Sequence, residues 1–568
     1  MTTPLRVASL LALLSCGAPA SAQAKPAPAP QPDAQAQAKS DAQDQDKDDD
    51  EDEEKEKEKH HKDEAKADAD PAPVVTEHEI TVNGKTLHYH ATAGYIVLKA
   101  EGEKGRGKGD GDDKSKGDAD LSKDNVKPKA KVFFVAYTLD GVTDPATRPV
   151  TFAFNGGPGS ASVWLHMAAM APRRAKLTDE GEAPPPPYQL VDNESTWLDD
   201  TDLVFIDPVS TGFSRPVGDE DARQFHGLQE DIASVGDFIR LYTTRNERWL
   251  SPKIVLGESY GTTRAAGLSD YLQNRYGLYL NGIVLVSSVL SFQSLEFTPQ
   301  NDSPFVGFLP TYAATAWYHE KLPADLQAKS VAEVAELARA FAGSDYTLAL
   351  SRGDTLSHDD LARVAGELAR FTGLPAAYWQ QRRLRVPDGL FFTKLLEDEG
   401  RIVGRFDSRF TGLRYEPGTD GGEYDPSDEA VSGPLTAAMN DYLRRELGFQ
   451  SDLTYETLVN VYPWNFGDAG GGFPNTAEDL RRAMTRNPYL KVWVTCSYYD
   501  VATPFYGAEL AVASMNLDPS VRSNLRFTYY DSGHMLYIHT PSRVKFKTDF
   551  EAFLKDATTQ QPVHAAAR

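Results

Sequence analysis

The sequence predicts an α/β fold with a mostly parallel central sheet, flanked by helices and interrupted by a large inserted cap region. Three observations lead to this class. Several short runs are apolar at every position, as expected for strands that are buried on both faces. These runs alternate with segments of helical periodicity, which is the order of a parallel sheet covered by helices. A long irregular interval then separates the earlier apolar runs from the last ones.

The first predicted element is a β-hairpin at 76–99, whose alternating strands meet at Asn83-Gly84, a pair favoured in tight turns. The glycine-rich segment at about 101–130 is expected to be a flexible insertion at a hairpin tip, because its glycines lack the strand-loop-helix context of a phosphate loop. Strands are then predicted at 131–139, 149–155, 202–207, 253–259 and 282–289, with helices at 227–244 and 263–276 between them. After the inserted region, strands at 489–500 and 525–533 alternate with helices near 505–515 and 541–556.

These elements divide the chain into six predicted parts. The inserted region is rich in Pro, Gly, aromatic residues and short helical patterns, and an insertion of this kind usually covers a site or shapes specificity. The parts are a signal peptide (1–24), a disordered acidic tail (25–73), the first part of the core (74–292), the inserted cap region (293–485), the second part of the core (486–556) and a disordered C-terminus (557–568).

Composition excludes two classes of protein. The chain has 568 residues and a net charge of −24, of which −9 comes from the 17 acidic and 8 basic residues between positions 25 and 70. That stretch has no aromatic residue and cannot bury a core, so it is expected to be disordered. The remaining body is moderately acidic, which argues against a dedicated nucleic-acid binder. No run approaches about 18 apolar residues, so an integral membrane segment is not expected.

The N-terminus has the pattern of an export signal. Arg6 precedes the apolar run 7–14, and small-residue cleavage patterns follow at 20–24. We therefore expect an exported protein, periplasmic or extracellular. The residues before Cys16 loosely resemble a lipoprotein cleavage site, which leaves lipid anchoring as a minor alternative. Without the signal, Cys496 is the single cysteine, and no internal disulfide is possible.

The strongest chemical motif is Gly257-Glu258-Ser259-Tyr260-Gly261. It matches G-x-S-x-G between an apolar strand and a helix, the context of a nucleophile elbow. The turn is sharp, so side chains two positions before and after the serine would collide. The pattern predicts that Ser259 is a nucleophile held above the edge of the sheet.

A nucleophilic serine needs a histidine base and an acid that orients it, and in this architecture they follow the serine in the order acid, then histidine. Five histidines follow Ser259, four of them before the C-terminus that is expected to be disordered. His534 is favoured because small residues surround it after a late strand; His539 is the near competitor, and His319 and His358 are expected at the surface of the insertion. Asp500, at the end of a strand, is the favoured acid. Asp531 lies too close to His534, and Asp207 precedes the serine.

Acyl transfer also requires donors for the developing oxyanion. The segment 154–160, Phe-Asn-Gly-Gly-Pro-Gly-Ser, follows a strand and offers backbone N–H groups. It has no Gly-Lys-Ser/Thr sequence, so it does not match a nucleotide loop. The second donor is expected to be the amide of Tyr260, directly after the nucleophile.

Four separated motifs together resemble the serine carboxypeptidase family, α/β-hydrolase peptidases that remove C-terminal residues. The resemblance implies a triad of Ser259, Asp500 and His534, and an oxyanion hole formed by the amides of Gly157 and Tyr260. The motifs are FNGGPGSAS (154–162), the segment 193–214, GESYG (257–261), and the paired segments 498–505 and 532–542.

The same resemblance implies that Asn155 and Glu258 bind the terminal carboxylate of the substrate. An ionised Glu258 would repel that carboxylate, so Glu258 must be protonated, and an acidic pH optimum is expected. The sequence departs from the family in two respects. The family's disulfides cannot form, and the family's second glutamate would fall near Ala169, where no acid is present.

The sequence therefore predicts a serine-type carboxypeptidase that acts on peptide or protein C-termini through an acyl-enzyme, without a metal or organic cofactor. An esterase or acyltransferase that uses the same triad is the first alternative. A non-enzymatic surface or assembly protein is the second. The preferred terminal residue and the oligomeric state are not evident from the sequence.

Overall fold

The computed structural model describes residues 71–99, 127–416, 424–467 and 472–559. The predicted signal peptide, the acidic tail up to residue 70, most of the glycine-rich segment and the chain from residue 560 lie outside this part. The described residues belong to one compact unit of the chain.

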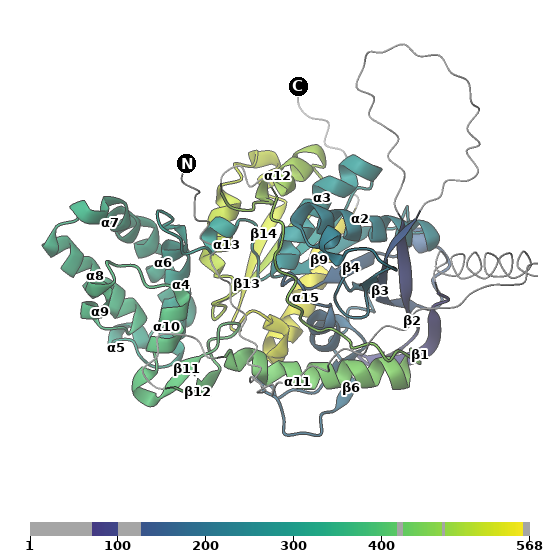
Figure 1. Ribbon diagram of the computed structural model, residues 1–568, viewed down its shortest axis with the longest axis horizontal. Coiled ribbons are helices and arrows are strands. Elements are labelled where there is room, and N and C mark those ends of the chain that lie inside the picture. The colour runs from purple at the N-terminus through teal and green to yellow at the C-terminus, as the bar shows by residue number, and fades with distance from the viewer. Residues whose placement is uncertain (1–70, 100–126, 417–423, 468–471, 560–568) are drawn as a thin grey trace, which may run out of the picture. The chain divides into compact units, whose positions relative to one another are not determined.

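The unit is built on a ten-stranded sheet, counted over the described residues, in the order β1-β2-β3-β7-β4-β9-β10-β13-β14, with β8 paired to β3 (Figure 1). Its strands are β1 (Val74–Val82), β2 (Lys85–Lys99), β3 (Pro128–Leu139), β4 (Val150–Phe154), β7 (Asp202–Ile206), β8 (Arg215–Pro216), β9 (Lys253–Glu258), β10 (Gly282–Val286), β13 (Lys491–Ser497) and β14 (Leu525–Tyr530). Two small antiparallel pairs stand apart from it: β5 (Arg173–Ala175) with β6 (Leu190–Asp192), and β11 (Arg401–Val403) with β12 (Thr411–Leu413).

The sheet is parallel where the predicted catalytic residues lie. From β7 through β4, β9, β10 and β13 to β14, each neighbouring pair is parallel, whereas β1, β2, β3 and β7 pair antiparallel. The carboxyl ends of β4, β9, β10, β13 and β14 therefore meet at one edge, the edge at which open parallel sheets bind their ligands. The strands β1 and β2 form the predicted hairpin around Asn83-Gly84.

Two hydrophobic cores lie on the two faces of the sheet, and this explains why the central strands are mostly apolar. In β9, Ile254 and Leu256 enter one core, and Val255 enters the other. In β10, Val284 enters the core that contains Leu256, and Ile283 enters the core that contains Val255. Successive residues of a strand point to opposite faces, so a strand covered on both faces needs apolar side chains at every position.

Helices cover both faces of the sheet. The helices α2, α3, α12 and α13 contribute to the core that contains Val255, and α11 and α15 contribute to the core that contains Leu256. These helices are α2 (Leu228–Arg245), α3 (Tyr260–Tyr276), α11 (Pro426–Asp441), α12 (Ala477–Arg486), α13 (Phe505–Ala513) and α15 (Thr540–Thr558); a shorter one, α14 (Pro519–Arg522), precedes β14.

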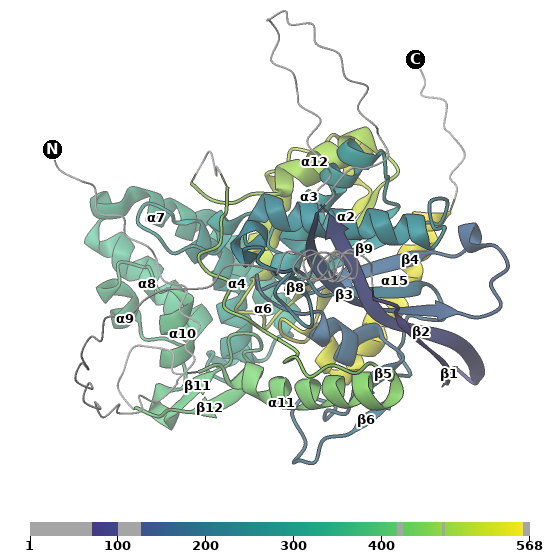
Figure 2. The ribbon, with the colours of Figure 1, turned by 45° about the vertical axis from the view of Figure 1, so that its right-hand side comes forward.

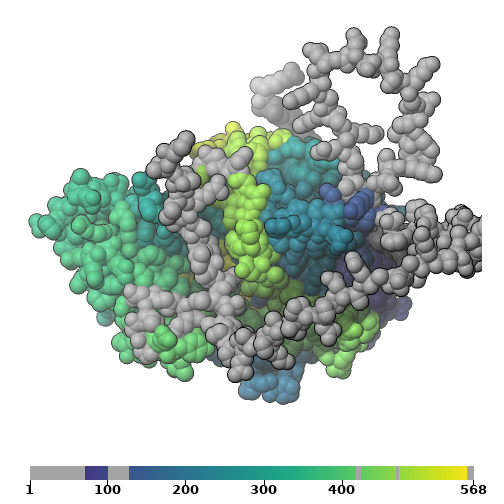
Figure 3. All heavy atoms as spheres, viewed as in Figure 1, coloured from purple at the N-terminus to yellow at the C-terminus, as the bar shows by residue number. Residues whose placement is uncertain are grey.

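The inserted region has a hydrophobic core of its own, formed mainly by residues 305–403. In Figures 1 and 2 its helices lie together at the end of the unit opposite to the β1–β2 hairpin, and the space-filling view shows the same segment as a separate green lobe (Figure 3). Its helices are α4 (Ser303–Tyr318), α5 (Ala324–Gln327), α6 (Val331–Phe341), α7 (Thr347–Arg352), α8 (His358–Thr372), α9 (Ala376–Gln381) and α10 (Asp388–Lys394).

The structure differs from two predicted boundaries. The glycine-rich insertion was expected to reach residue 130, but β3 already begins at Pro128, because Ala130 pairs with Leu98 of β2 and is fully buried. The inserted cap region was expected to extend to residue 485, but α11 and α12 within it pack on the sheet core instead. Leu480 and Met484 of α12 are buried in the same hydrophobic cluster as residues of α3.

No helix in the described part of the chain is long and apolar enough to cross a membrane.

Candidate active site

Ser259 occupies a tight turn between β9 and α3. Its backbone has φ 60° and ψ −131°, a strained conformation for a residue with a side chain. The strand ends at Glu258, and the helix begins at Tyr260. The amide of Ser259 donates to the carbonyl of Val286 at the end of β10, with 3.0 Å between N and O. The side chain of Ser259 remains partly exposed, while both of its neighbours are buried.

The two glycines of the motif are required by close backbone contacts. A Cβ atom on Gly257 would lie 2.0 Å from the carbonyl oxygen of Gly261. A Cβ atom on Gly261 would lie 2.9 Å from the carbonyl oxygen of Phe154, at the end of β4. Any side chain at these positions would displace the backbone, so the turn fits the strand-to-helix geometry of a nucleophile elbow.

His534 and Asp500 lie together after neighbouring strands. His534 follows β14 and Asp500 follows β13, and 2.9 Å separates Nδ1 of His534 from Oδ2 of Asp500. Asp500 is itself fixed: its Oδ1 accepts from the amides of Ala502 and Thr503 at 2.9 Å each, and its Oδ2 accepts from the Thr503 hydroxyl at 2.7 Å. With Nδ1 turned toward Asp500, Nε2 is the ring nitrogen available to another group.

A segment of the inserted region, residues 404–409 between β11 and β12, holds the histidine loop in place. The carbonyl of Phe406 accepts from the amide of His534 at 2.6 Å, and its ring stacks on the imidazole with 5.1 Å between centroids. The carboxylate of Asp407 accepts from the amide of Gly533 at 3.0 Å. A Cβ atom on Gly533 would lie 2.4 Å from the Phe406 carbonyl oxygen, so a glycine is needed there. The insertion therefore supports the site directly.

The glycine loop after β4 packs against the elbow. A Cβ atom on Gly156 would lie 2.4 Å from the amide nitrogen of Tyr260. Gly157 has φ +100°, a left-handed conformation that glycine adopts without strain. Arg264 of α3 fastens the loop by donating to the carbonyl of Asn155 at 2.7 Å, and it also pairs with the buried carboxylate of Asp231. The amides of Gly157 and Tyr260 thus belong to two backbone segments in direct contact.

Glu258 and Asn155 lie side by side in the interior. Each is 3% exposed, and the side chain of Asn155 lowers the pKa of the Glu258 carboxyl. Oδ1 of Asn155 accepts from the amide of Leu165 at 3.2 Å, which leaves its NH₂ group as the donor. The hydroxyl of Tyr537 donates to Oε2 of Glu258, with 2.5 Å between the oxygens.

Burial controls the protonation of Glu258. Desolvation raises the pKa of its carboxyl from 4.5 to about 7, against the opposing influence of His534 and of the hydrogen bond from Tyr537. Glu258 is therefore largely neutral in acidic solution. For His534, burial lowers the pKa, but the carboxylate of Asp500 outweighs it, and the net pKa is raised. An ionised Glu258 raises the pKa of His534 further, so a neutral Glu258 favours the neutral imidazole that a base requires.

The competing candidates occupy other positions. Asp207 is buried and accepts from the amide and hydroxyl of Ser162, which is a structural role at the end of β7. Asp531 is exposed, and His358 is exposed on α8. His539 caps α15 and bonds through Nδ1 to Ser542. The expectation that His319 lies at the surface was wrong: it is partly buried, and its Nε2 lies 2.6 Å from the Ser408 carbonyl oxygen.

The helical turn η2 (Leu165–Met170) contains the position at which the family has its second glutamate. All six side chains of this turn are buried, and none is acidic. Glu258 instead has the phenol of Tyr537 as a neighbour, a residue that sequence reasoning missed. The signal was present, since Tyr537 lies three residues after His534, but no motif rule connects a tyrosine there with the elbow.

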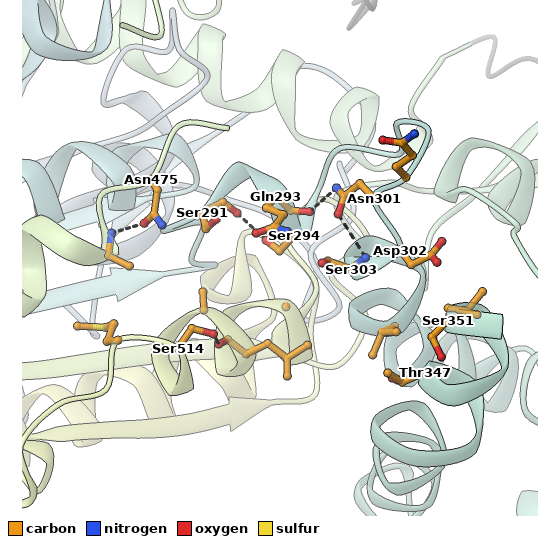
Figure 4. Close-up of a pocket in the computed structure, with 18 of the residues that line it drawn as sticks. Ser291, Gln293, Ser294, Asn301, Asp302, Ser303, Thr347, Ser351, Asn475 and Ser514 are labelled. Carbon is orange, nitrogen blue, oxygen red and sulfur yellow. Dashed lines mark hydrogen bonds between the residues drawn. The ribbon is translucent and has the colours of Figure 1, made fainter. Parts of the chain in front are cut away.

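A pocket lies between η4 (Phe292–Ser294), α4, α7, α12 and α13 (Figure 4). Its volume is about 550 Å³, and hydroxyl and amide side chains such as Ser291, Gln293, Asn301 and Asn475 line it. Neither Ser259 nor His534 contributes to its wall. It is therefore separate from the predicted catalytic residues.

Comparison with known families agrees with this arrangement. The family model described as "Serine carboxypeptidase" matches residues 113–293, a segment that includes the glycine loop after β4 and the Ser259 elbow. Over this segment the chain is similar to the serine carboxypeptidase family. The sheet order and the elbow are those of the α/β-hydrolase fold, and the predicted fold class is confirmed.

Similar serine carboxypeptidases include a yeast and a plant protein. The pheromone-processing carboxypeptidase KEX1 of Saccharomyces cerevisiae is 33% identical over 150 residues, which cover 25% of this chain and 19% of the yeast protein. Serine carboxypeptidase-like 51 of Arabidopsis thaliana is 27% identical over 182 residues, covering 30% and 37% of the two chains. The matches thus span about a fifth to a third of these relatives.

Solved structures with a similar course of the chain include the yeast Kex1Δp carboxypeptidase, with a TM-score of 0.47, 15% identity and coverage of 82% of this chain and 91% of that one. A proline iminopeptidase from Mycobacterium smegmatis has a TM-score of 0.33 and 14% identity, with 75% and 95% covered.

Proposed function

We propose that this protein is a serine-type carboxypeptidase that releases C-terminal amino acids from peptides and works best at acidic pH. One observation carries the proposal: the imidazole of His534 is hydrogen-bonded to the fixed carboxylate of Asp500, at the edge of the sheet from which the Ser259 elbow rises. A nucleophile, a base and an orienting acid at one sheet edge are the components of acyl transfer.

In this proposal, Oγ of Ser259 attacks the carbonyl carbon of the last peptide bond, and Nε2 of His534 accepts its proton. The carbonyl oxygen becomes an oxyanion, which the amides of Gly157 and Tyr260 stabilise. When the C–N bond breaks, His534 returns the proton to the leaving nitrogen, and the terminal amino acid departs. Water then attacks the acyl-enzyme with the same base, which regenerates Ser259. Asp500 holds the imidazole and stabilises its protonated form, and no cofactor is required.

Glu258 and Asn155 distinguish an exopeptidase from a general hydrolase in this proposal. A neutral Glu258 has one O–H to donate, and Asn155 has an amide NH₂, so both can donate to the terminal carboxylate of a peptide. The raised pKa of Glu258, about 7, supports this role, because the group remains protonated through the acidic range. Recognition weakens as pH rises through that value, which gives the acidic optimum.

The test compares a peptide with its C-terminally amidated twin between pH 4 and pH 7, using the mature protein and the Ser259→Ala variant. Stepwise loss of terminal residues from the free acid alone, abolished by Ser259→Ala, supports the proposal. Equal cleavage of both peptides contradicts it. Absence of turnover with the wild type, unchanged by Ser259→Ala, favours the non-enzymatic alternative.

An esterase or acyltransferase with the same triad is the second candidate. The observation that favours it is the absence of an acidic side chain in the turn 165–170, where the family has a second glutamate. Turnover of simple esters without release of amino acids from free-acid peptides would support it.

We also propose that the chain is exported to the periplasm or the cell exterior. The support is the charged, apolar and small-residue pattern of residues 1–24. N-terminal sequencing of the protein recovered from the periplasm would show a start after residue 22 or 24. A lipid-modified Cys16 would favour anchoring instead.

A further inference from the structure

Tyr537 connects the histidine loop with the elbow. It lies in the short helical turn η9 (Leu536–Ile538), three residues after His534, and its side chain is fully buried. Its hydroxyl is 2.5 Å from Oε2 of Glu258, the residue directly before the nucleophile. The contact joins two segments 279 positions apart in the chain. Because no part of Tyr537 is exposed, its effect on a substrate must act through its neighbours, and Glu258 is the neighbour to which its hydroxyl donates.

The contact determines which oxygen of Glu258 can carry a proton. Burial keeps the pKa of the Tyr537 hydroxyl well above its usual value, so the phenol is a donor. A donor on Oε2 makes that oxygen an acceptor, and the proton of a neutral Glu258 must then be on Oε1. Without Tyr537, the proton could occupy either oxygen. The hydrogen bond from Tyr537 therefore fixes the O–H group of a neutral Glu258 at Oε1.

The other groups that act on Glu258 do not replace this constraint. His534 and Asp500, which follow β14 and β13, affect the pKa of the carboxyl through their charges, and Asn155, which follows β4, lowers it. The turn 165–170 offers no second carboxyl to share a proton with Glu258. Tyr537 is thus the neutral hydroxyl that is hydrogen-bonded to the acid in this buried cluster.

We propose that Tyr537 is a positioning residue for substrate recognition. By donating to Oε2 of Glu258, it keeps the acid's single proton on Oε1, from which the O–H donates to the terminal carboxylate of the bound peptide. This inference rests on the proposed carboxypeptidase function. In it, the phenol of Tyr537 takes the place of a second acidic side chain beside Glu258. It also has a consequence for pH, since a hydrogen bond to the ionised carboxylate favours ionisation. Removal of the hydroxyl keeps Glu258 protonated to higher pH.

The first experiment compares the wild type with Tyr537→Phe, using free-acid peptides and a small ester substrate. We expect KM for the peptide to rise about tenfold with kcat within about twofold, no change for the ester, and a basic limb of kcat/KM displaced to higher pH. The matched control is Tyr530→Phe, which removes another tyrosine-carboxylate bond (2.7 Å, from the buried Tyr530 to the partly buried Asp549) between β14 and α15. The control should leave KM and the pH profile unchanged.

An active Tyr537→Phe enzyme with the wild-type KM and the wild-type basic limb overturns the inference and leaves the proposed function intact. A wild type that releases no terminal residue overturns the proposed function itself. If Tyr537→Phe does not fold, Glu258→Gln gives a second test with the tyrosine in place. Tyr537 should then orient the amide so that its NH₂ replaces the Oε1 proton, and KM at pH 5 should be at least about threefold lower than in Glu258→Ala, which has no donor at this position. A smaller difference between the two variants counts against the inference.

Discussion

The hydroxyl of Ser287 donates to the carbonyl oxygen of His534, with 2.6 Å between the two oxygens. The preceding residue, Val286, accepts from the amide of Ser259 at 3.0 Å. Two consecutive residues at the end of β10 therefore hold the backbone of the proposed nucleophile and the backbone of the proposed base. This strand lies between the strands that carry Ser259 and Asp500, so one structural element sets the spacing of the site.

Replacing Ser287 should disturb catalysis more than binding. Ser287→Ala leaves the buried carbonyl of His534 without its donor, which costs about 1–3 kcal/mol and releases the histidine loop. We expect kcat to fall about tenfold with little change in KM, as measured by steady-state hydrolysis of a free-acid peptide. Ser288→Ala is the matched control, because the buried hydroxyl of Ser288 has no hydrogen-bond partner among the described residues. Equal effects of the two variants would contradict this account.

Asp500→Asn should abolish most activity while leaving the site's shape unchanged. The two backbone amides would retain the asparagine oxygen, so its NH₂ group would face Nδ1 of His534. Nδ1 would become an acceptor, and the ring proton would move to Nε2. Nε2 could then not act as the base, because a base must be unprotonated. We expect kcat to fall by at least about 10³-fold with KM nearly constant. Retention of more than a tenth of the activity would exclude Asp500 from the proposed triad.

The buried carboxyl of Glu258 makes stability depend on pH. Its pKa in the folded chain, about 7, exceeds its ordinary value of 4.5, so the stability that the neutral form provides is present below pH 4.5 and is lost as pH rises through 7. The loss corresponds to about 3 kcal/mol. Glu258→Gln cannot ionise, and its free energy of unfolding should gain about 3 kcal/mol relative to the wild type between pH 4 and pH 8.

Urea unfolding at the two pH values measures this difference, and a relative gain below about 1 kcal/mol would be inconsistent with a buried, neutral Glu258. In peptide hydrolysis, the same variant should lose the basic limb near pH 7 and remain active at higher pH. A basic limb unchanged by Glu258→Gln would mean that another group produces it.

Arg264 of α3 holds the glycine loop that follows β4. Its guanidinium is 1% exposed, pairs with Asp231 and holds the Asn155 carbonyl. Arg264→Met should destabilise the fold by about 3–5 kcal/mol, because the carboxylate of Asp231 is left buried without a partner. The double variant Arg264→Met with Asp231→Leu should recover much of this stability but not the activity, because the loop's anchor is still missing. Thermal unfolding and hydrolysis rates separate the two effects, and full recovery of both would exclude a role for Arg264 in holding the loop.

Much of the fold was predictable because burial on two faces leaves a simple trace in the sequence. The runs that became β4, β7, β9 and β10 are mostly apolar, since alternate residues enter the two cores. The elbow glycines were predictable for a related reason: their constraint is local, within five residues. The end of the inserted region was not predictable, because α12 has the same amphipathic pattern whether it packs on the insertion or on α3.

The contacts that position the site were beyond the reach of sequence reasoning. Ser287 and His534 are 247 positions apart, and Phe406 meets His534 from the inserted region. Tyr537 could be seen near His534 in the sequence, but not its pairing with Glu258. Periodicity reports which face of an element is buried, and it carries no information about which loops meet at the sheet edge.

Arg405 should influence the protonation of the proposed base. It lies in the segment that holds the histidine loop, with its guanidinium carbon 5.4 Å from the Phe406 ring centroid, and its positive charge lowers the pKa of His534 against the stronger opposing effect of Asp500. Arg405→Met removes that charge, so the pKa of His534 should rise and the acidic limb of kcat/KM should move to higher pH. Arg401→Met, at the exposed start of β11, removes the same charge a few residues away and should leave the limb in place. Profiles of kcat/KM from pH 3 to pH 8 for both variants measure the effect. An acidic limb that stays fixed in Arg405→Met, or moves equally in both, would show that the arginine's charge does not reach the imidazole.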